Sequence, residues 1–148
     1  MDKDEIYLLE IAARGGGVFI SSDLIYEKTG FHSEDFLINK SLAQPTNIQI
    51  EDTGAFVGYR AFYIPSGKVV DVSGIDRVKS LPHIRRHQFD NIRNGMTVGE
   101  NTNKTSRIAF IVVADSYEQW EQRCAEVADI LHVKVSASDG SEKDIIWE

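Results

Sequence analysis

The chain has 148 residues, of which 42% are hydrophobic and 26% charged, as in a globular protein of one domain or two small ones. Its net charge of −7 argues against a surface built to neutralise nucleic-acid phosphates. There is no apolar run of about 18 residues and no charged-then-apolar leader, so neither a membrane span nor a signal peptide is predicted. The single cysteine, Cys124, excludes an internal disulfide and favours a reducing cytoplasm.

The first apolar stretch, Ile6–Ala13, is interrupted only by Glu10 and reads as a strand that is covered on both faces. A carboxylate in such a strand requires a partner, because burying an unpaired charge costs several kcal/mol. Strand alternation puts Glu10 and Arg14 on one face, about 13 Å apart, with only a small alanine between them. Gly15, Gly16 and Gly17 follow and free the backbone for close approach to a ligand.

Two interpretations of this stretch remain open. Glu10 and Arg14 would suit a site for a metal–nucleotide complex or an acyl phosphate. They would equally form a structural ion pair at a strand end, with the glycines making a turn.

The strand also begins directly after a polar tip at residues 1–4. We therefore expect the chain to be the C-terminal piece of something longer, with a strand edge left bare before Glu5.

Two short helices are predicted next. Ser21, Ser22 and Asp23 are good N-cap residues for a helix that passes through Lys28 and ends at Gly30. A second helix is expected from Ser33 to about Ala43. Its expected inward face consists of Phe36, Leu37, Leu42 and Ile38. Residues 44–53 are polar and read as a connection.

Strands follow from Ala55 onward. Residues 55–64 and 68–72, joined by Pro65-Ser66-Gly67, predict a β-hairpin. Residues 76–82 are expected to form a loop or short helical turn, and 83–92 to be extended. Residues 107–114 predict a strongly buried strand.

The last helix carries the clearest local signal. Ser116-Tyr117-Glu118-Gln119 has the form of a capping box, and Trp120, Cys124, Val127 and Leu131 share one helical face. In that position Cys124 is a core residue rather than a nucleophile. Residues 133–135 predict a short strand, and residues 136–148 a flexible tail.

Other polar residues favour ordinary surface roles. His83 and His87 are four residues apart, but Pro82 before them argues against a helix that would place both on one metal, so a polar surface is expected. The basic residues Arg77, Lys79, Arg85, Arg86 and Arg93 read as a solvated face, with an anionic partner as the alternative.

The glycine triplet matches neither common phosphate-loop pattern. With Leu9-Glu10-Ile11-Ala12-Ala13-Arg14 before it and Thr29-Gly30 and a helix after it, the stretch instead resembles the C-terminal part of ATP-grasp enzymes. The likeness is to carbamoyl-phosphate-synthase-like and amino-acid-ligase-like members. The order of the later elements is similar to the small domain that follows the ATP-grasp core in biotin-carboxylase-like relatives.

The resemblance implies roles for individual residues. Glu10 would bind Mg²⁺ that bridges ATP phosphates. Arg14 would be catalytic and face the γ-phosphate or acyl phosphate. Gly15, Gly16 and Gly17 would lie beside the substrates, and the reaction would join an activated carboxylate to an amine. Ala12 stands where many relatives have asparagine. The family's ATP lid, adenine pocket and other metal glutamate lie upstream of Glu10, so this chain alone is expected neither to bind Mg·ATP tightly nor to be active.

These inferences predict an α+β chain. Residues 1–45 would end an ATP-grasp core with its central strand, Gly-rich loop and short helices. Residues 46–135 would form a small antiparallel β subdomain with a C-terminal helix, and 136–148 the tail. The expected protein is a cytoplasmic carboxylate–amine ligase, completed by an N-terminal part in the same or a separate chain, without nucleic-acid or membrane partners. The alternative is a non-catalytic assembly module that pairs through its exposed strand edge with a partner or a second copy.

Overall fold

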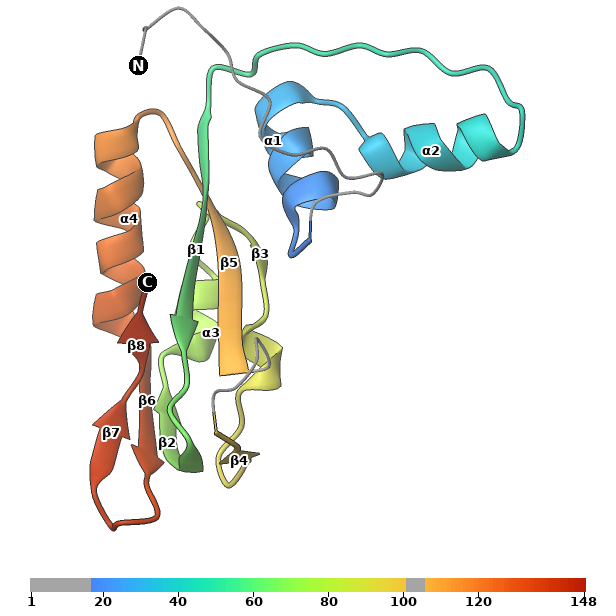
Figure 1. Ribbon diagram of the computed structural model, residues 1–148. Coiled ribbons are helices and arrows are strands. Elements are labelled where there is room, and N and C mark those ends of the chain that lie inside the picture. Colours follow the sequence, from blue (N-terminus) through green and yellow to red (C-terminus); the bar gives the residue numbers. More distant parts are fainter. Residues whose placement is uncertain (1–16, 101–105) are drawn as a thin grey trace, which may run out of the picture.

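The computed structural model describes residues 17–100 and 106–148, and within these ranges the chain is a mixture of helices and antiparallel strands. A helical segment, residues 17–53, comes first and the strands follow, with α3 and α4 among them (Figure 1). The predicted α+β class is confirmed. The elements are η1 (Ile20–Leu24), α1 (Ile25–Thr29), α2 (Ser33–Ser41), β1 (Phe56–Tyr63), β2 (Gly67–Ser73), α3 (Ile75–Lys79), β3 (Ile84–His87), η2 (Phe89–Asn91), β4 (Thr97–Val98), β5 (Arg107–Ala114), α4 (Tyr117–Ile130), β6 (His132–Ser136), β7 (Glu142–Asp144) and β8 (Ile146–Trp147).

The strands form two four-stranded antiparallel sheets. Sheet A has the order β3-β5-β1-β8, and sheet B has the order β4-β2-β6-β7. The longest pairing joins β1 to β5, from Phe56 opposite Ala114 to Tyr63 opposite Arg107. The buried strand predicted at residues 107–114 is therefore confirmed as a central strand of sheet A.

The predicted hairpin is wrong, because β1 and β2 lie in different sheets. The connection through Pro65 and Ser66 carries the chain from sheet A to sheet B instead of reversing it within one sheet. Gly67 is needed at this crossing: its φ is +141°, and an added Cβ would lie 2.4 Å from the carbonyl oxygen of Ser136. A local turn signal cannot reveal that each strand has better partners farther along the chain.

Sheet A is buried on both faces. On its inner face, Phe62, Phe110 and Val112 belong to the main core, which α4 closes with Trp120, Cys124, Val127 and Leu131. Strand alternation directs Ala61, Ala109 and Ile111 to the opposite, outer face, where they are also buried and where η1 and α1 lie against the sheet. The helical segment thus shields part of the outer face.

Helix α4 confirms the capping-box prediction. The Ser116 hydroxyl accepts a hydrogen bond from the backbone N–H of Gln119 at 3.2 Å. The side-chain oxygen of Gln119 in turn accepts from the N–H of Asp115 at 2.8 Å, one residue before the N-cap. Both bonds satisfy amides at the helix start, where the backbone offers no partner. None of the described helices has the length and apolar composition needed to cross a bilayer.

The expected flexible tail at 136–148 is wrong. Residues Glu142–Asp144 pair with β6, and Ile146–Trp147 pair with the end of β1. The Trp147 ring lies 4.8 Å from the ring of Phe62 and 6.2 Å from that of Phe110. Polar residues at 136–144 obscured a turn at Gly140, whose φ is +81°, that brings these strands back to the sheets.

We expect Trp147→Ala to lower the free energy of unfolding by about 2 to 3 kcal/mol, somewhat less than for a fully buried tryptophan, because the ring loses its contacts with the core. Ile146→Ala is the matched control, since its side chain is 57% exposed and the change should cost less than about 0.5 kcal/mol. Urea denaturation measures both. Equal effects for the two variants would show that Trp147 contributes no core packing.

The helical segment, residues 17–53, differs from the expectation in two ways. Its first helix begins as a π-helical turn at Ile20, and no side chain caps it; the helix still ends at Gly30 with φ +67°, as predicted. The expected inward face of α2 is wrong for Leu37, Ile38 and Leu42, which are 59%, 57% and 63% exposed, whereas Phe36 is half-buried. Helix α2 extends away from both sheets (Figure 1). Helical spacing predicted an apolar face, but within the described residues nothing covers it.

Candidate functional site

The residues singled out from the sequence lie at the edge of the described structure. Glu10, Arg14, Gly15 and Gly16 are outside the described residues, so their roles stay predictions. Gly17 is described, and an added Cβ there would meet nothing within 4 Å. The structure of this stretch can therefore be followed from Gly17 and Val18 onward.

The chain leaves the glycine triplet through a strained turn. Val18 and Phe19 have φ angles of +47° and +64°, in the left-handed region that costs about 1–2 kcal/mol per non-glycine residue. For β-branched Val18 this conformation is especially rare. The carbonyl of Phe19 then accepts from the N–H groups of Asp23 and Leu24, which opens the π-helical turn η1. Strained backbone and π-turns both occur often at functional sites.

Two arginines of β3 hold this turn against sheet A. Arg85 Nε lies 3.3 Å from a carboxylate oxygen of Glu27, and Arg86 Nε lies 3.9 Å from one of Asp23. The Arg86 guanidinium also lies over the ring of Phe19, 5.3 Å from its centre. Both arginine side chains stay exposed, 45% for Arg85 and 58% for Arg86, in keeping with the expected solvated basic face, and they also pair with acids of the helical segment.

A small cavity lies where the turn meets the outer face of sheet A. Val18, Tyr59, Gln88, Arg107 and Ala109 line its volume of about 60 Å³. The Gln88 side-chain oxygen accepts a hydrogen bond from the N–H of Ala109 at 3.0 Å. The Tyr59 hydroxyl is buried and makes no well-formed hydrogen bond with a described residue. The cavity thus combines fixed polar groups with one unsatisfied hydroxyl.

Arg107 is the charged member of this cavity. Its Nε donates to Glu148 at 2.8 Å, Nη2 donates to the other Glu148 oxygen, and the guanidinium lies 4.9 Å from the centre of the Tyr59 ring. The bond from Arg107 lowers the pKa of Glu148, with a smaller contribution from Tyr63. Burial raises the pKa of Tyr59, and the nearby Arg107 only partly offsets this, so Tyr59 stays a neutral donor at physiological pH. Sequence reasoning had not singled out Tyr59, Gln88 or Arg107.

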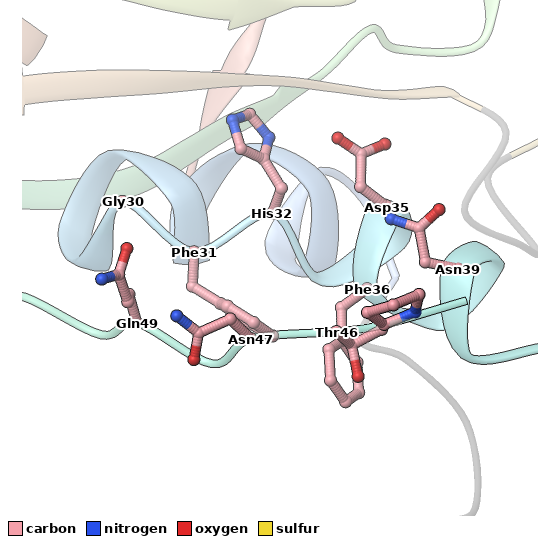
Figure 2. A pocket seen from close by; sticks show the side chains of 10 residues that line it. Gly30, Phe31, His32, Asp35, Phe36, Asn39, Thr46, Asn47 and Gln49 are labelled. Atoms are coloured by element: carbon pink, nitrogen blue, oxygen red, sulfur yellow. The ribbon is translucent and has the colours of Figure 1, made fainter. Parts of the chain in front are cut away.

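A larger and more open hollow lies between α2 and the extended residues that follow it (Figure 2). Its volume is about 300 Å³. Asp35 and Asn39 of α2 and Asn47 and Gln49 of the extended segment supply polar groups around it. Two phenylalanines among its lining residues, Phe31 and Phe36, have ring centres 5.6 Å apart. Its lining combines amide side chains with these aromatic rings, so it offers a surface for contact.

The histidines and the cysteine have structural environments. His83 is only 8% exposed and His87 stacks on Phe89, so the expected polar surface is wrong for both. Burial lowers the pKa of each histidine. Burial also raises the pKa of Cys124 to about 12, which confirms it as a core residue with little thiolate at neutral pH.

The described residues contain no group of three or more His, Cys, Asp or Glu side chains placed to hold a metal. The predicted metal ligand, Glu10, lies outside them. The Mg²⁺ site that the resemblance implies would therefore depend on Glu10. What it supplies is a strained turn, a polar cavity beside it and an uncovered apolar face.

Comparisons with known proteins give a consistent picture. The sequence model of the family described as L-amino acid ligase C-terminal domain 2 matches residues 60–136. Among solved structures, the crystal structure of L-amino acid ligase from Bacillus licheniformis is similar in fold, with a TM-score of 0.65, 24% sequence identity and coverage of 86% of this chain. This chain covers 32% of that ligase chain. No curated protein matches the sequence. The family match begins within β1, so the glycine turn lies outside it.

Proposed function

Because this chain belongs to the L-amino acid ligase C-terminal domain 2 family, we propose that it works as the C-terminal segment of an ATP-dependent ligase. Its fold is that of the C-terminal part of an ATP-grasp-type ligase, as predicted. The proposed reaction activates a carboxylate as an acyl phosphate and joins it to an amine. The likeness to carbamoyl phosphate synthase and the cytoplasmic location stay predictions.

The proposed roles of the glycine stretch rest on the sequence. Glu10 would hold Mg²⁺, Arg14 would face the transferred phosphoryl group, and Gly15, Gly16 and Gly17 would allow close approach of the substrates. The bound ATP would supply the phosphoryl group that activates the carboxylate. The strained backbone at Val18 and Phe19 supports these roles, because residues with strained backbone angles cluster at active sites and ligand-binding sites.

We further propose that an upstream ATP-binding part, in the same or a separate chain, covers the helical segment. No residue from 17 to 53 is fully buried, so this segment has no core of its own. Eight of the eleven exposed large apolar side chains of the described part lie there: Val18, Ile20, Tyr26, Leu37, Ile38, Leu42, Ile48 and Ile50. Such a concentration marks a surface that another part of a protein buries. About two-thirds of the solved ligase chain has no counterpart in this sequence, since only 32% of it is covered, and that length is ample to supply the cover.

The direct test of the function is a ligation assay on the protein with its upstream part supplied, in which ADP formation and a new amide product are measured together. Amide formation that depends on ATP, on a carboxylate and on an amine is the expected result. The chain alone is expected to show none. Measurable ATP hydrolysis that follows this chain through purification and is lost in Glu10→Ala would overturn the requirement for an upstream part.

If an upstream part covers this apolar surface, a substitution there should affect stability differently in the isolated chain and in the completed ligase. We expect Leu37→Asp to change the unfolding free energy of the isolated chain by less than about 0.5 kcal/mol, because Leu37 is 59% exposed there. In the completed ligase the same change should cost more than about 2 kcal/mol or prevent assembly, because it buries a charge. Thermal denaturation of both forms makes the comparison. Val70→Asp, at an exposed apolar position of β2, is the control and should have similar effects in both forms. A similar effect of Leu37→Asp in both forms would contradict the proposed interface.

A further inference from the structure

The small cavity between Val18 and sheet A is lined by hydrogen-bond donors. Its volume of about 60 Å³ exceeds the minimum of about 15 Å³ that one water needs, and it suits a group of two or three heavy atoms. Three of the five lining residues carry a side-chain N–H or O–H, namely Tyr59, Gln88 and Arg107.

The orientation of Gln88 is set by the backbone of β5. The Gln88 side-chain oxygen accepts from the backbone N–H of Ala109 at 3.0 Å, and the backbone N–H of Gln88 donates to the Ala109 carbonyl at 3.0 Å. With the oxygen engaged, the remaining polar group of this side chain is the NH₂, which only donates. Gln88 is thus fixed as a donor at the cavity.

Tyr59 and Arg107 supply the other donors. The Tyr59 hydroxyl is buried without a well-formed partner among the described residues, a state that a bound acceptor would relieve. Glu148 occupies Nε and Nη2 of Arg107, so the guanidinium keeps further N–H donors, those of Nη1 among them, for another acceptor. The Glu148 contact also shows that a carboxylate already fits one edge of this guanidinium.

We propose that Tyr59, Gln88 and Arg107 form a binding site for the carboxylate group of a ligase substrate. Three converging donors match an acceptor-only group, and a carboxylate satisfies the unpaired Tyr59 hydroxyl. The cavity is lined by Val18, the residue directly after the glycine triplet, so a ligand held here would lie close to the end of that triplet. This inference rests on the proposed function for its substrate. Two carboxylates are available: the one that is activated, and the one carried by an amine substrate that is itself an amino acid.

Binding is tested first on the 148-residue chain, with acetate as the probe in an NMR titration. We expect saturable shifts of the Gln88 side-chain amide and of the Val18 and Ala109 backbone amides. L-Alanine should reproduce them, and L-alaninamide, which lacks the carboxylate, should not. No saturable shift up to roughly 100 mM acetate, where a millimolar site would be full, would show a cavity that holds only water and overturn the proposal.

Two variants sharpen this titration. Gln88→Glu keeps an oxygen for the Ala109 N–H but replaces the donor by a negative charge, so acetate affinity should fall at least about tenfold. Tyr59→Phe keeps the ring beneath Arg107 and removes only the hydroxyl, so affinity should also fall. Tyr117→Phe is the matched control, because Tyr117 is exposed on α4 and does not line the cavity, so the affinity for acetate should not change. Unchanged binding in Gln88→Glu would refute the assigned site.

The completed ligase then identifies which carboxylate binds. A raised KM for the amine substrate in Tyr59→Phe, with an unchanged KM for ATP, would assign the site to an amino acid that supplies the amine. A raised KM for the activated substrate would assign it to that carboxylate. If neither KM changes while the ligase is active, the site has no role in substrate binding. If the protein shows no ligation at all, the proposed function fails, and the acetate titration still decides whether the site exists.

Discussion

In the completed ligase, Glu10→Ala should reduce ATP-dependent amide formation by at least about 10²–10³-fold, a loss typical when one preorganised charged group is removed from a reaction centre. The physical reason is that Mg²⁺ prefers hard, charged oxygen ligands, and alanine offers none. Glu10→Gln is the isosteric variant and should lose most of the activity too, because its neutral amide is a much weaker metal ligand. The measurement is the rate of ADP and amide formation, with Mg²⁺ varied. Partial rescue by excess Mg²⁺ would support the role as a metal ligand.

The competing interpretation is a structural ion pair between Glu10 and Arg14, and it predicts a different result. In that case Glu10→Ala, Arg14→Ala and the double variant would show a coupling energy in the unfolding free energy of the isolated chain. Under our proposal the single changes leave the chain's stability within about 0.5 kcal/mol, and the loss appears in activity. A large stability coupling with activity retained in Glu10→Ala would replace the metal site by the ion pair.

Local signals in the sequence predicted those parts of the fold that local contacts determine. The capping residues of α4, the glycine that ends α1 and the apolar run of β5 each have a physical cause within a few residues. The errors arose where pairing is distant. Strands β1 and β2 are adjacent in sequence yet pair with β5 and β6, and β8 pairs with β1 from the far end of the chain. The choice among distant partners depends on the whole core, which a turn pattern does not report.

The candidate site likewise has one part that the sequence could predict and one part that it could not. Glycines next to an interrupted apolar run can be recognised in a sequence because they are contiguous. The lining residues Tyr59, Gln88 and Arg107 come from three different strands or their ends, and only the pairing of sheet A brings them together. Their one sequence signal is weak: Tyr59 of β1 and Arg107 of β5 are polar residues on the strand face opposite the core, in strands that are mostly apolar. That pattern is ordinarily read as a solvent-exposed face, so their convergence with Val18 could not be anticipated.

A second large effect is expected at Gly74, which connects β2 to α3. Its φ is +85°, and an added Cβ would lie 2.0 Å from the carbonyl oxygen of Ile130, a backbone atom near the end of α4. Gly74→Ala therefore combines left-handed strain of about 1–2 kcal/mol with overpacking of about 1–3 kcal/mol. Because backbone on both sides would have to shift, we expect a total loss of at least about 3 kcal/mol in the free energy of unfolding.

Gly95→Ala separates these two causes. Gly95 has nearly the same φ, +81°, but an added Cβ there would meet nothing within 4 Å. This variant should lose only the strain energy, about 1–2 kcal/mol, so the difference between the two variants measures the contact between the α3 start and α4. Urea denaturation followed by circular dichroism gives both values, and Gly74→Ala should also broaden or shift NMR signals at the end of α4. Equal losses in the two variants would mean that α4 moves aside freely. In that case the contact does not fix the angle at which α3 and α4 meet, and the packing of α4 on sheet A alone sets its position.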